Sequence, residues 1–423
     1  MSLLVKNDRK KQVHHGYNNN KAPLMLNKSY SLLWLGQLVS QVGNRIYLMA
    51  LAWYFVSVLD SKDGLFLMFI ISSLPSLLLG VLVGPLVERW NKKHIIIVCD
   101  LISVGLTGLL AWMVYEKMET RALIYAICFL LNTVNLFFSP SVNSILPVII
   151  RGDQLQKGMA YMKMITFLGQ IMGAAVGGAL VGLVGVYLTI LINAVSFLIS
   201  AFAELFIEYK PEISLKAHHY FREMKEGFLY LKSQAIIRMV LFVSIGCNLF
   251  LPVLVVMIPI LVDDKMKLDA MHYGFADAML PLGAILMAVW LANRVKQQTP
   301  LKALTIGISI IGLCFLMVSA FNHYGVLLLA VFLYGCFTNY INIQVVTYFL
   351  QTVDPAYRGR FFSLLESCSY AIISLAYVWA SMVSKLFEVD TALAINGAGL
   401  LLFAALAYYW NRKQLAQTKK RIC

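Results

Sequence analysis

The chain has 423 residues, of which 60% are hydrophobic and only 13% are charged. A soluble domain carries about 25% charged residues, so much of the apolar material here must face lipid. The formal net charge is +14, from 35 Lys and Arg against 21 Asp and Glu, which in a soluble protein would suggest nucleic acid as a partner. The same composition excludes a disordered chain and a disulfide-rich secreted scaffold. We therefore predict an integral membrane protein.

Apolar stretches long enough to cross a membrane, about 20 residues each, occur twelve times, six on each side of a polar interval. They lie at about 30–59, 65–87, 94–115, 121–149, 158–184, 186–207, 236–262, 271–293, 301–321, 324–350, 357–386 and 391–410. The junction at 184–186 is short, and fusing the two stretches beside it would give eleven spans. The predicted fold class is an all-α membrane protein with twelve transmembrane helices.

The polar segments predict five parts. These are a cytoplasmic N-terminal segment (1–29), a six-helix half (30–208), an amphipathic cytoplasmic linker (209–235), a second six-helix half (236–411) and a cytoplasmic tail (412–423). Loops on the N-terminal side hold 27 Lys and Arg, whereas loops on the other side hold 6. Because cytoplasmic loops are enriched in Lys and Arg, both termini are predicted to be cytoplasmic. The positive charge then reflects orientation, and we expect no nucleic-acid partner.

Sequence motifs of enzymes and metal sites are absent. The 7 cysteines form no Cys-x-x-Cys pair, and the pairs His14–His15 and His218–His219 lack the i,i+4 spacing of helical metal ligands. The chain also has no phosphate-binding Gly-rich loop with a Lys and no nucleophile elbow. We predict no metal site, no cofactor and no enzymatic activity.

The loop after the second span, residues 84–93, reads Gly-Pro-Leu-Val-Glu-Arg-Trp-Asn-Lys-Lys. It resembles the signature between helices two and three of the major facilitator superfamily, Gly-x-x-x-Asp-Arg-x-Gly-Arg-Arg, with Glu88 in place of the Asp. In that family the acid contacts the inner end of helix eleven, where the positive end of the helix dipole favours a carboxylate. The alternative is an ordinary basic cytoplasmic loop.

The resemblance implies a conformational latch that helps to hold the outward-facing state. Its residues would be Gly84, Glu88, Arg89, Lys92, Lys93, Arg358 and Arg360, together with Asp100 as a structural partner of Arg89 or a neighbouring lysine.

The fifth span repeats small residues at every fourth position, which lets another helix approach closely. Its glycines are Gly169, Gly173, Gly177 and Gly178. The pattern resembles the helix-five motif of facilitator-family exporters, Gly-x-x-x-Gly-Pro-x-x-Gly-Gly, with Ala174 in the proline position. The resemblance favours export over import.

Several further stretches are similar to the macrolide-efflux and siderophore-export branch of the superfamily. They are 36–37, 40–43, 138–141, 145–147, 221–227 and 354–364. The resemblance implies two six-helix halves around a central cavity that opens alternately to each side. The resemblance also implies a monomeric exporter in the lipid bilayer of a bacterial inner membrane, driven by a proton or sodium gradient. We expect its substrate to be a medium-sized amphiphilic compound, a macrolide-like drug or a siderophore. The alternatives are an importer of the same fold and a lipid-flipping protein, which would need a laterally open polar groove.

Ionisable residues inside the spans are candidate substrate or coupling groups, because each is costly in lipid unless it faces a cavity or a partner. Arg45, in the middle of the first span, could bind an anionic substrate group or pair with a structural carboxylate. Asn44 stands where relatives often carry an acid. Asp277 and Glu366 could carry a proton or bind a cation, or only form interhelical hydrogen bonds. Glu204 is expected at the membrane interface.

Overall fold

The computed structural model describes residues 27–118, 120–150, 154–209, 235–293, 299–354 and 358–422. Within these ranges the chain is almost entirely helical and contains no strand. The first half comprises α2 (Lys28–Trp53), η2 (Tyr54–Val58), α3 (Lys62–Arg89), α4 (Lys92–Glu116), α5 (Arg121–Ile149) and α6 (Leu155–Leu205). The second half comprises α8 (Ala235–Asn248), α9 (Leu251–Ile260), η4 (Leu261–Lys265), α10 (Ala270–Ala292), α11 (Pro300–Ala320), α12 (Tyr324–Thr352), α13 (Arg358–Leu386) and α14 (Val389–Ile422).

Side-chain caps fix where several helices begin. The Asn27 side chain accepts a hydrogen bond from the Tyr30 backbone N–H at the start of α2, and Ser61 caps α3 in the same way. Asp269 caps α10 by accepting from the His272 backbone N–H. The pKa of Asp269 is lowered because the His272 ring and backbone both hydrogen-bond its carboxylate. Such caps satisfy backbone N–H groups that have no partner inside the helix.

The observed helices follow the predicted spans. In the described ranges, nine helices are long and apolar enough to cross a membrane. The helix α6 has 51 residues and bends at Gly185, whose φ of 82° lies in the left-handed region, so the break falls at the predicted 184–186 junction. The predicted 236–262 span is divided between α8 and α9, next to Pro252, which has no backbone N–H to donate. The count of twelve spans stays a prediction.

Three of the predicted parts are short polar segments outside the two halves. The first part, 1–29, and the linker, 209–235, lie mostly outside the described residues. The predicted tail 412–423 is helical as far as Ile422, because α14 continues without a break beyond the membrane-spanning stretch.

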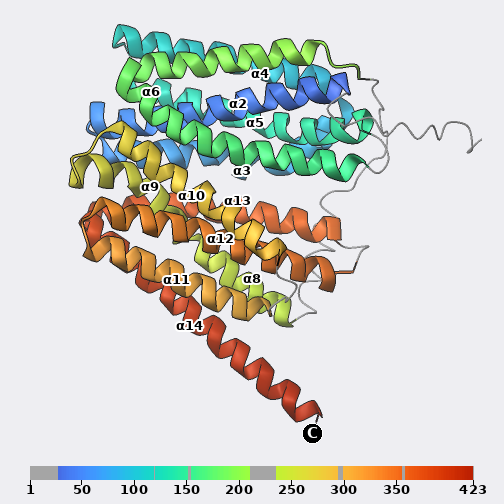
Figure 1. Cartoon of the computed structure of the whole chain (residues 1–423), viewed down its shortest axis with the longest axis vertical. Helices are drawn as coiled ribbons and strands as arrows, with labels where there is room; N and C mark the ends of the chain where they lie inside the picture. Colours follow the sequence, from blue (N-terminus) through green and yellow to red (C-terminus); the bar gives the residue numbers. More distant parts are fainter. Residues whose placement is uncertain are drawn as a thin grey trace, which may run out of the picture.

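The molecule has two halves that lie side by side (Figure 1). In the first half, α6 packs against α2 and α4, and α3 packs against α5; in the second, α11 packs against α14 and α12. The halves contact each other mainly through α6 with α10 and through α3 with α13. We call the end of the bundle where α2 begins the terminal end, and the end where η2 finishes the far end.

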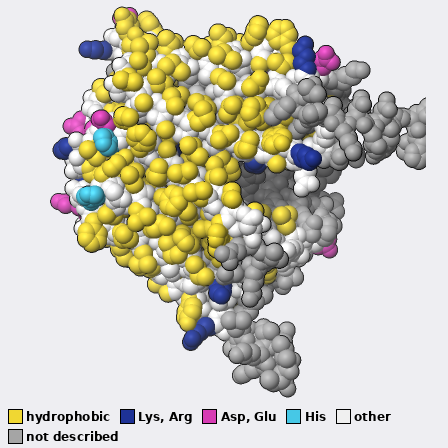
Figure 2. Space-filling model, viewed as in Figure 1, with side chains coloured by type: hydrophobic (Ala, Val, Ile, Leu, Met, Phe, Trp, Pro, Cys, Tyr) yellow, Lys and Arg dark blue, Asp and Glu magenta, His cyan; other side chains and the backbone are white. Residues whose placement is uncertain are grey.

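Large apolar side chains cover the outer surface of the bundle. Phe202, Leu402 and Trp112 are 63%, 71% and 54% exposed, and Figure 2 shows hydrophobic side chains over the face of both halves, with charged side chains at the two ends. A soluble protein would not expose so continuous an apolar surface, so this surface faces lipid.

Candidate functional site

The glycines of α6 form close contacts with α2 of the same half and with α10 of the other half. A Cβ added at Gly173 would lie 2.5 Å from the Arg45 Cβ, so α2 fits against α6 only because that position is glycine. A Cβ at Gly178 would lie 2.6 Å from the Ala270 carbonyl oxygen, and one at Gly274 would lie 2.6 Å from the Ala174 carbonyl oxygen. The glycine pattern of the fifth span therefore forms a backbone-to-backbone contact between the halves.

Beside this contact, Arg45 of α2 forms an ion pair with Asp277 of α10, so one partner comes from each half. The Asp277 side chain is 3% exposed and the Arg45 side chain 20%. Tyr273 of α10 and Tyr377 of α13 lie close to the guanidinium. Of the two roles that the sequence leaves open for Arg45, the structure shows the pairing with a carboxylate, and the substrate role stays a prediction.

Further contacts between the halves also lie toward the far end. The ring of Trp53 stacks on that of Tyr273 at a centroid distance of 6.0 Å, and the rings of Phe69 and Tyr377 lie 5.3 Å apart. The paired charges are Lys62 with Asp264, and Lys385 with Asp63 at 3.5 Å. At the terminal end, no hydrogen bond or ion pair joins a described side chain of one half to a described side chain of the other. The halves are closed at the far end.

The exposed pair Lys62–Asp264 should contribute little to this closure. Its side chains are 45% and 40% exposed, and ion pairs exposed to water contribute about 0–1 kcal/mol. We expect Lys62→Ala to change the ratio of closed to open far ends by less than about fivefold. Spin–spin distances between labels on the two halves at the far end would measure this ratio. A larger change would show that this ion pair contributes strongly to the stability of the state that is closed at the far end.

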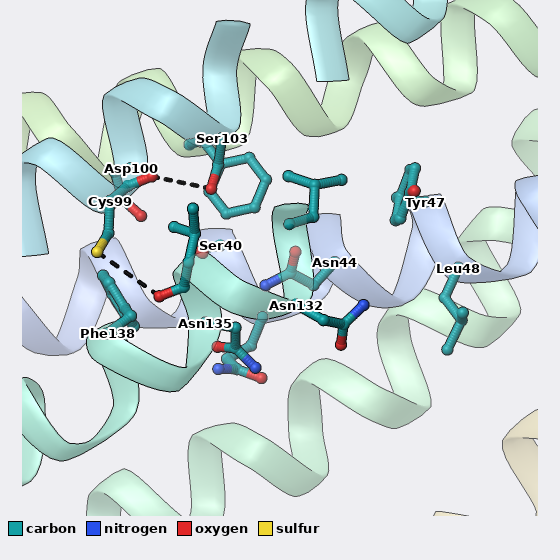
Figure 3. A pocket seen from close by; sticks show the side chains of 14 residues that line it. Ser40, Asn44, Tyr47, Leu48, Cys99, Asp100, Ser103, Asn132, Asn135 and Phe138 are labelled. Carbon is teal, nitrogen blue, oxygen red and sulfur yellow. Dashed lines mark hydrogen bonds between the residues drawn. The ribbon is translucent and has the colours of Figure 1, made fainter. Parts of the chain in front are cut away.

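A polar pocket of about 270 Å³ lies inside the first half (Figure 3). Half of its lining residues carry hydroxyl or amide side chains, from α2, α4 and α5, and Asp100 forms part of its wall. The lining includes Ser40, Gln41, Asn44, Ser103, Asn132 and Asn135, with Leu48 and Phe138 as apolar members. Sequence reasoning identified only Asn44 and Asp100 of this set. The other lining residues could have been recognised in the sequence from amide side chains that lie one helical turn apart in an apolar span, such as Asn132 and Asn135.

Asp100 and Glu204 occupy different surroundings from those expected. Asp100 is 1% exposed and makes no ion pair with Arg89, which lies at the exposed end of α3. Glu204 is fully buried between helices and is not exposed at the membrane interface. The burial of these two acids was not expected, because distance from a helix end does not reveal which side of the helix its neighbours cover.

The structure describes the side chains of only some of the proposed latch residues. Glu88 and Arg89 are exposed at the terminal end, and the Lys92 ammonium donates to the Glu88 carbonyl oxygen at 2.8 Å. Gly84 has open space around its Cβ position, and Lys93 donates to the Leu205 carbonyl oxygen at 2.8 Å. The side chains of Arg358, Arg360 and Glu366 lie outside the described residues, so the latch and the role of Glu366 stay predictions.

A second hollow, of about 630 Å³, lies along α4 and α5 near the terminal end. Arg89, Trp90 and His94 belong to its polar part, and its remaining lining is mostly apolar. These apolar residues include Ile95, Val98, Ile102, Val134 and Phe137. In the described ranges, no group of three or more His, Cys, Asp or Glu side chains could hold a metal ion.

Comparison with known proteins identifies relatives along nearly the whole chain. The family model described as "Transmembrane secretion effector", of the major facilitator type, matches residues 19–421. Macrolide efflux protein A of Streptococcus pyogenes is 22% identical over 88% of this chain and 90% of its own length. The Staphyloferrin A transporter of Staphylococcus aureus (strain NCTC 8325 / PS 47) is 21% identical over 90% of this chain and 94% of its own.

Solved structures show the same fold. The nucleoside transporter NupG superposes with a TM-score of 0.75 at 14% identity, covering 90% of this chain and 98% of the other. A bacterial homologue of the iron transporter ferroportin superposes with a TM-score of 0.70 at 15% identity, covering 92% and 99% of the two chains.

Proposed function

Because the chain belongs to the transmembrane secretion effector family of major facilitator transporters, we propose that it exports a medium-sized amphiphilic compound from the cytoplasm. The compound would be a macrolide-like drug or a siderophore, in keeping with the names of two relatives. Transport would proceed by alternating access of the two halves and would be driven by a proton or cation gradient. The protein is a multi-pass membrane transporter and not an enzyme.

The main support for this proposal is that the two halves contact each other mostly at one end of the molecule, the far end. Contacts between the described parts of the halves gather at the far end, around the Arg45–Asp277 pair and the Gly178–Gly274 contact. The excess of Lys and Arg in loops of the terminal end supports a cytoplasmic position for that end. In that orientation, the contacts between the described parts of the halves would close the molecule toward the outside, as in the state in which an exporter loads its substrate from the cytoplasm.

The chemistry of the polar pocket fits part of such a compound. Amide and hydroxyl groups of Gln41, Asn132 and Asn135 can both donate and accept hydrogen bonds, while Leu48 and Phe138 offer apolar contact. A pocket of about 270 Å³ is smaller than a typical drug site. It would therefore hold one hydroxyl-rich group while the rest of the compound lies between the halves.

Coupling would involve the groups that change partner when the far end opens. Opening must separate Arg45 from Asp277, and each buried charge then needs a new partner in place of the one it has lost. An anionic substrate group could replace Asp277 beside Arg45, and a proton could neutralise Asp277. Asn44 neighbours Arg45 in the chain and lines the pocket; with Glu366 it completes the proposed set of substrate and coupling residues.

The apolar lining of the hollow along α4 and α5 supports export of a soluble amphiphile over lipid flipping. A flipping protein would present a polar groove toward lipid, whereas Ile95, Val98 and Phe137 line this one. Transfer of a fluorescent phospholipid between leaflets by the purified protein would favour the lipid-flipping function instead.

The direct test uses proteoliposomes with an imposed pH or sodium gradient and radiolabelled erythromycin or a citrate-type siderophore. Vesicles in which the terminal end faces outward should accumulate one of these compounds, and vesicles without protein should not. Accumulation only in the opposite orientation would identify an importer. No movement of either compound in either orientation would contradict both proposed substrate classes.

The latch makes a separate prediction. In the outward-facing state, Glu88 would lie against the positive N-terminal end of α13, an interaction of about 0.3–1 kcal/mol. Glu88→Ala should therefore shift the population toward the state that is closed at the far end, by up to roughly fivefold. Spin labels at exposed Met118 and Leu386, one on each half at the far end, would report the shift. An unchanged distance distribution would remove Glu88 from the latch.

A further inference from the structure

Two carboxylates lie together inside the first half, away from the Arg45–Asp277 pair. Asp100 of α4 is 1% exposed and Glu204 of α6 is fully buried. They are close enough for the charge of one to act on the other. Both oxygens of Glu204 and one oxygen of Asp100 have no hydrogen-bond partner.

A buried donor points into the same place. Ser200 lies one turn before Glu204 on α6, is 0% exposed and is positioned beside Asp100. Its hydroxyl makes no hydrogen bond of good geometry. The Ser200 hydroxyl faces Asp100 and can donate to only one carboxylate oxygen. The remaining oxygens of the two acids therefore still lack a donor, which indicates that a proton completes the cluster, because buried polar groups are normally satisfied.

The surrounding helices bring no cation to the pair. The charged residues of α2 are Lys28, at its first position, and Arg45, which is paired with Asp277. The single charged residue of α5 is Arg121, which begins the helix and lies at the far end of the bundle. On α4 the other titratable group beside both acids is the Cys99 thiol, which donates to the Val134 carbonyl oxygen at 3.6 Å.

The lysines at the start of α4 are engaged elsewhere. The Lys92 ammonium donates to the Glu88 carbonyl oxygen, and the Lys93 ammonium donates to the Leu205 carbonyl oxygen, both at 2.8 Å. Neither forms an ion pair with Asp100 or Glu204, and all four of these side chains are described. Among the described residues, the two carboxylates thus have no counter-ion.

Two ionised carboxylates cannot remain adjacent and buried without compensation, since the desolvation of each costs several kcal/mol and their charges repel. One proton removes one negative charge, and it converts a carboxylate oxygen into a donor for one of the partnerless oxygens. Binding forms an O–H bond on Asp100 or Glu204, and release returns that proton to water in the pocket.

We infer that Asp100 and Glu204 share one proton and form a proton-coupling site inside the first half, in addition to the coupling role proposed above for Asp277. The inference rests on the proposed transport function and names its ion and site. Asp100 lines the polar pocket with Ser40, Asn44 and Ser103 (Figure 3), so the pocket gives the proton a route to water. Glu204 lies behind it and stores the proton out of contact with solvent.

The first test needs no transported compound. Infrared spectra of the full-length protein in phosphatidylcholine vesicles at neutral pH should contain a protonated-carboxyl stretching band that shifts in D₂O. The double variant Asp100→Asn/Glu204→Gln should lose this band. The swapped variant Asp100→Glu/Glu204→Asp should keep it, as should Glu88→Gln, in which an exposed acid is neutralised. A band of full intensity in the double variant, or none in the wild type, overturns the proton-sharing pair.

The second test separates this inference from the proposed function. A gradient of about one pH unit supports up to tenfold accumulation for each proton exchanged. With erythromycin as the probe, Asp100→Asn and Glu204→Gln should still let it move down its own gradient but should lose accumulation driven by the pH gradient. Full pH-driven accumulation in both variants overturns the coupling role. If the wild type moves no erythromycin while the infrared result holds, the substrate proposal fails and the proton site stands.

Discussion

Arg45→Ala should open the far end of the molecule and reduce transport by about 100-fold. The substitution leaves Asp277, whose side chain is 3% exposed, as a buried carboxylate without its cation. Removing one partner of a buried pair costs about 3–5 kcal/mol. This cost falls on the state in which the halves are closed at the far end, because only there do the two residues meet.

The measurement is the distance between spin labels at positions 118 and 386, recorded together with erythromycin flux in the same vesicles. Longer distances in Arg45→Ala should accompany the loss of flux. Arg121→Ala, which removes an exposed arginine at the far end of α5, is the matched control and should change neither quantity. Wild-type distances and flux in Arg45→Ala would show that the ion pair does not hold the closed state.

A neutral double variant separates closure from coupling. Arg45→Gln/Asp277→Asn replaces the ion pair with two amides that can hydrogen-bond to each other without a buried charge. Closure at the far end should return toward that of the wild type, whereas transport should stay low if Arg45 also binds an anionic substrate group. Recovery of both closure and transport would make the pair purely structural.

The helices were predictable because the membrane imposes their length. Each predicted span coincides with helix because an apolar stretch of about 20 residues satisfies its backbone only by coiling. The bend at Gly185 also falls where the sequence places a short junction, since only glycine readily adopts its φ of 82°. The division between α8 and α9 could be anticipated from Pro252, although the continuous hydropathy of 236–262 concealed it.

The candidate site was less predictable because its pairs come from distant parts of the chain. Arg45 and Asp277 are both visible as intramembrane charges, yet 232 residues separate them, and no local pattern assigns one to the other. Asp100 and Glu204 were placed near helix ends and given separate structural roles. Their pairing depends on how α4 packs against α6, which hydropathy does not specify.

Gly178→Ala should also destabilise the state that is closed at the far end, in this case through a steric clash. The added Cβ would lie 2.6 Å from the Ala270 carbonyl oxygen and 3.0 Å from the Gly274 Cα, both backbone atoms that cannot rotate away. Overpacking of this kind costs about 1–3 kcal/mol, so the ratio of closed to open far ends should fall by roughly 5- to 150-fold. The same spin-label distance measures the ratio.

The chain offers a matched control one turn along the same helix. A Cβ at Gly182 would meet no atom within 4 Å, so Gly182→Ala makes the same chemical change without the clash. Gly274→Ala should reproduce Gly178→Ala, because its Cβ would lie 2.6 Å from the Ala174 carbonyl oxygen. If both variants behave like Gly182→Ala, the glycine contact does not set the closed state.

Combining the two substitutions tests whether the glycine contact and the ion pair act on one interface. Arg45 lies against Gly173, one helical turn before Gly177 and Gly178, so α6 links the two contacts. Neighbouring changes in one interface are not additive. Once Arg45→Ala has separated the halves, the Gly178 Cβ no longer meets α10. Adding Gly178→Ala to Arg45→Ala should therefore open the far end little further, whereas independent contacts would give the product of the two single effects.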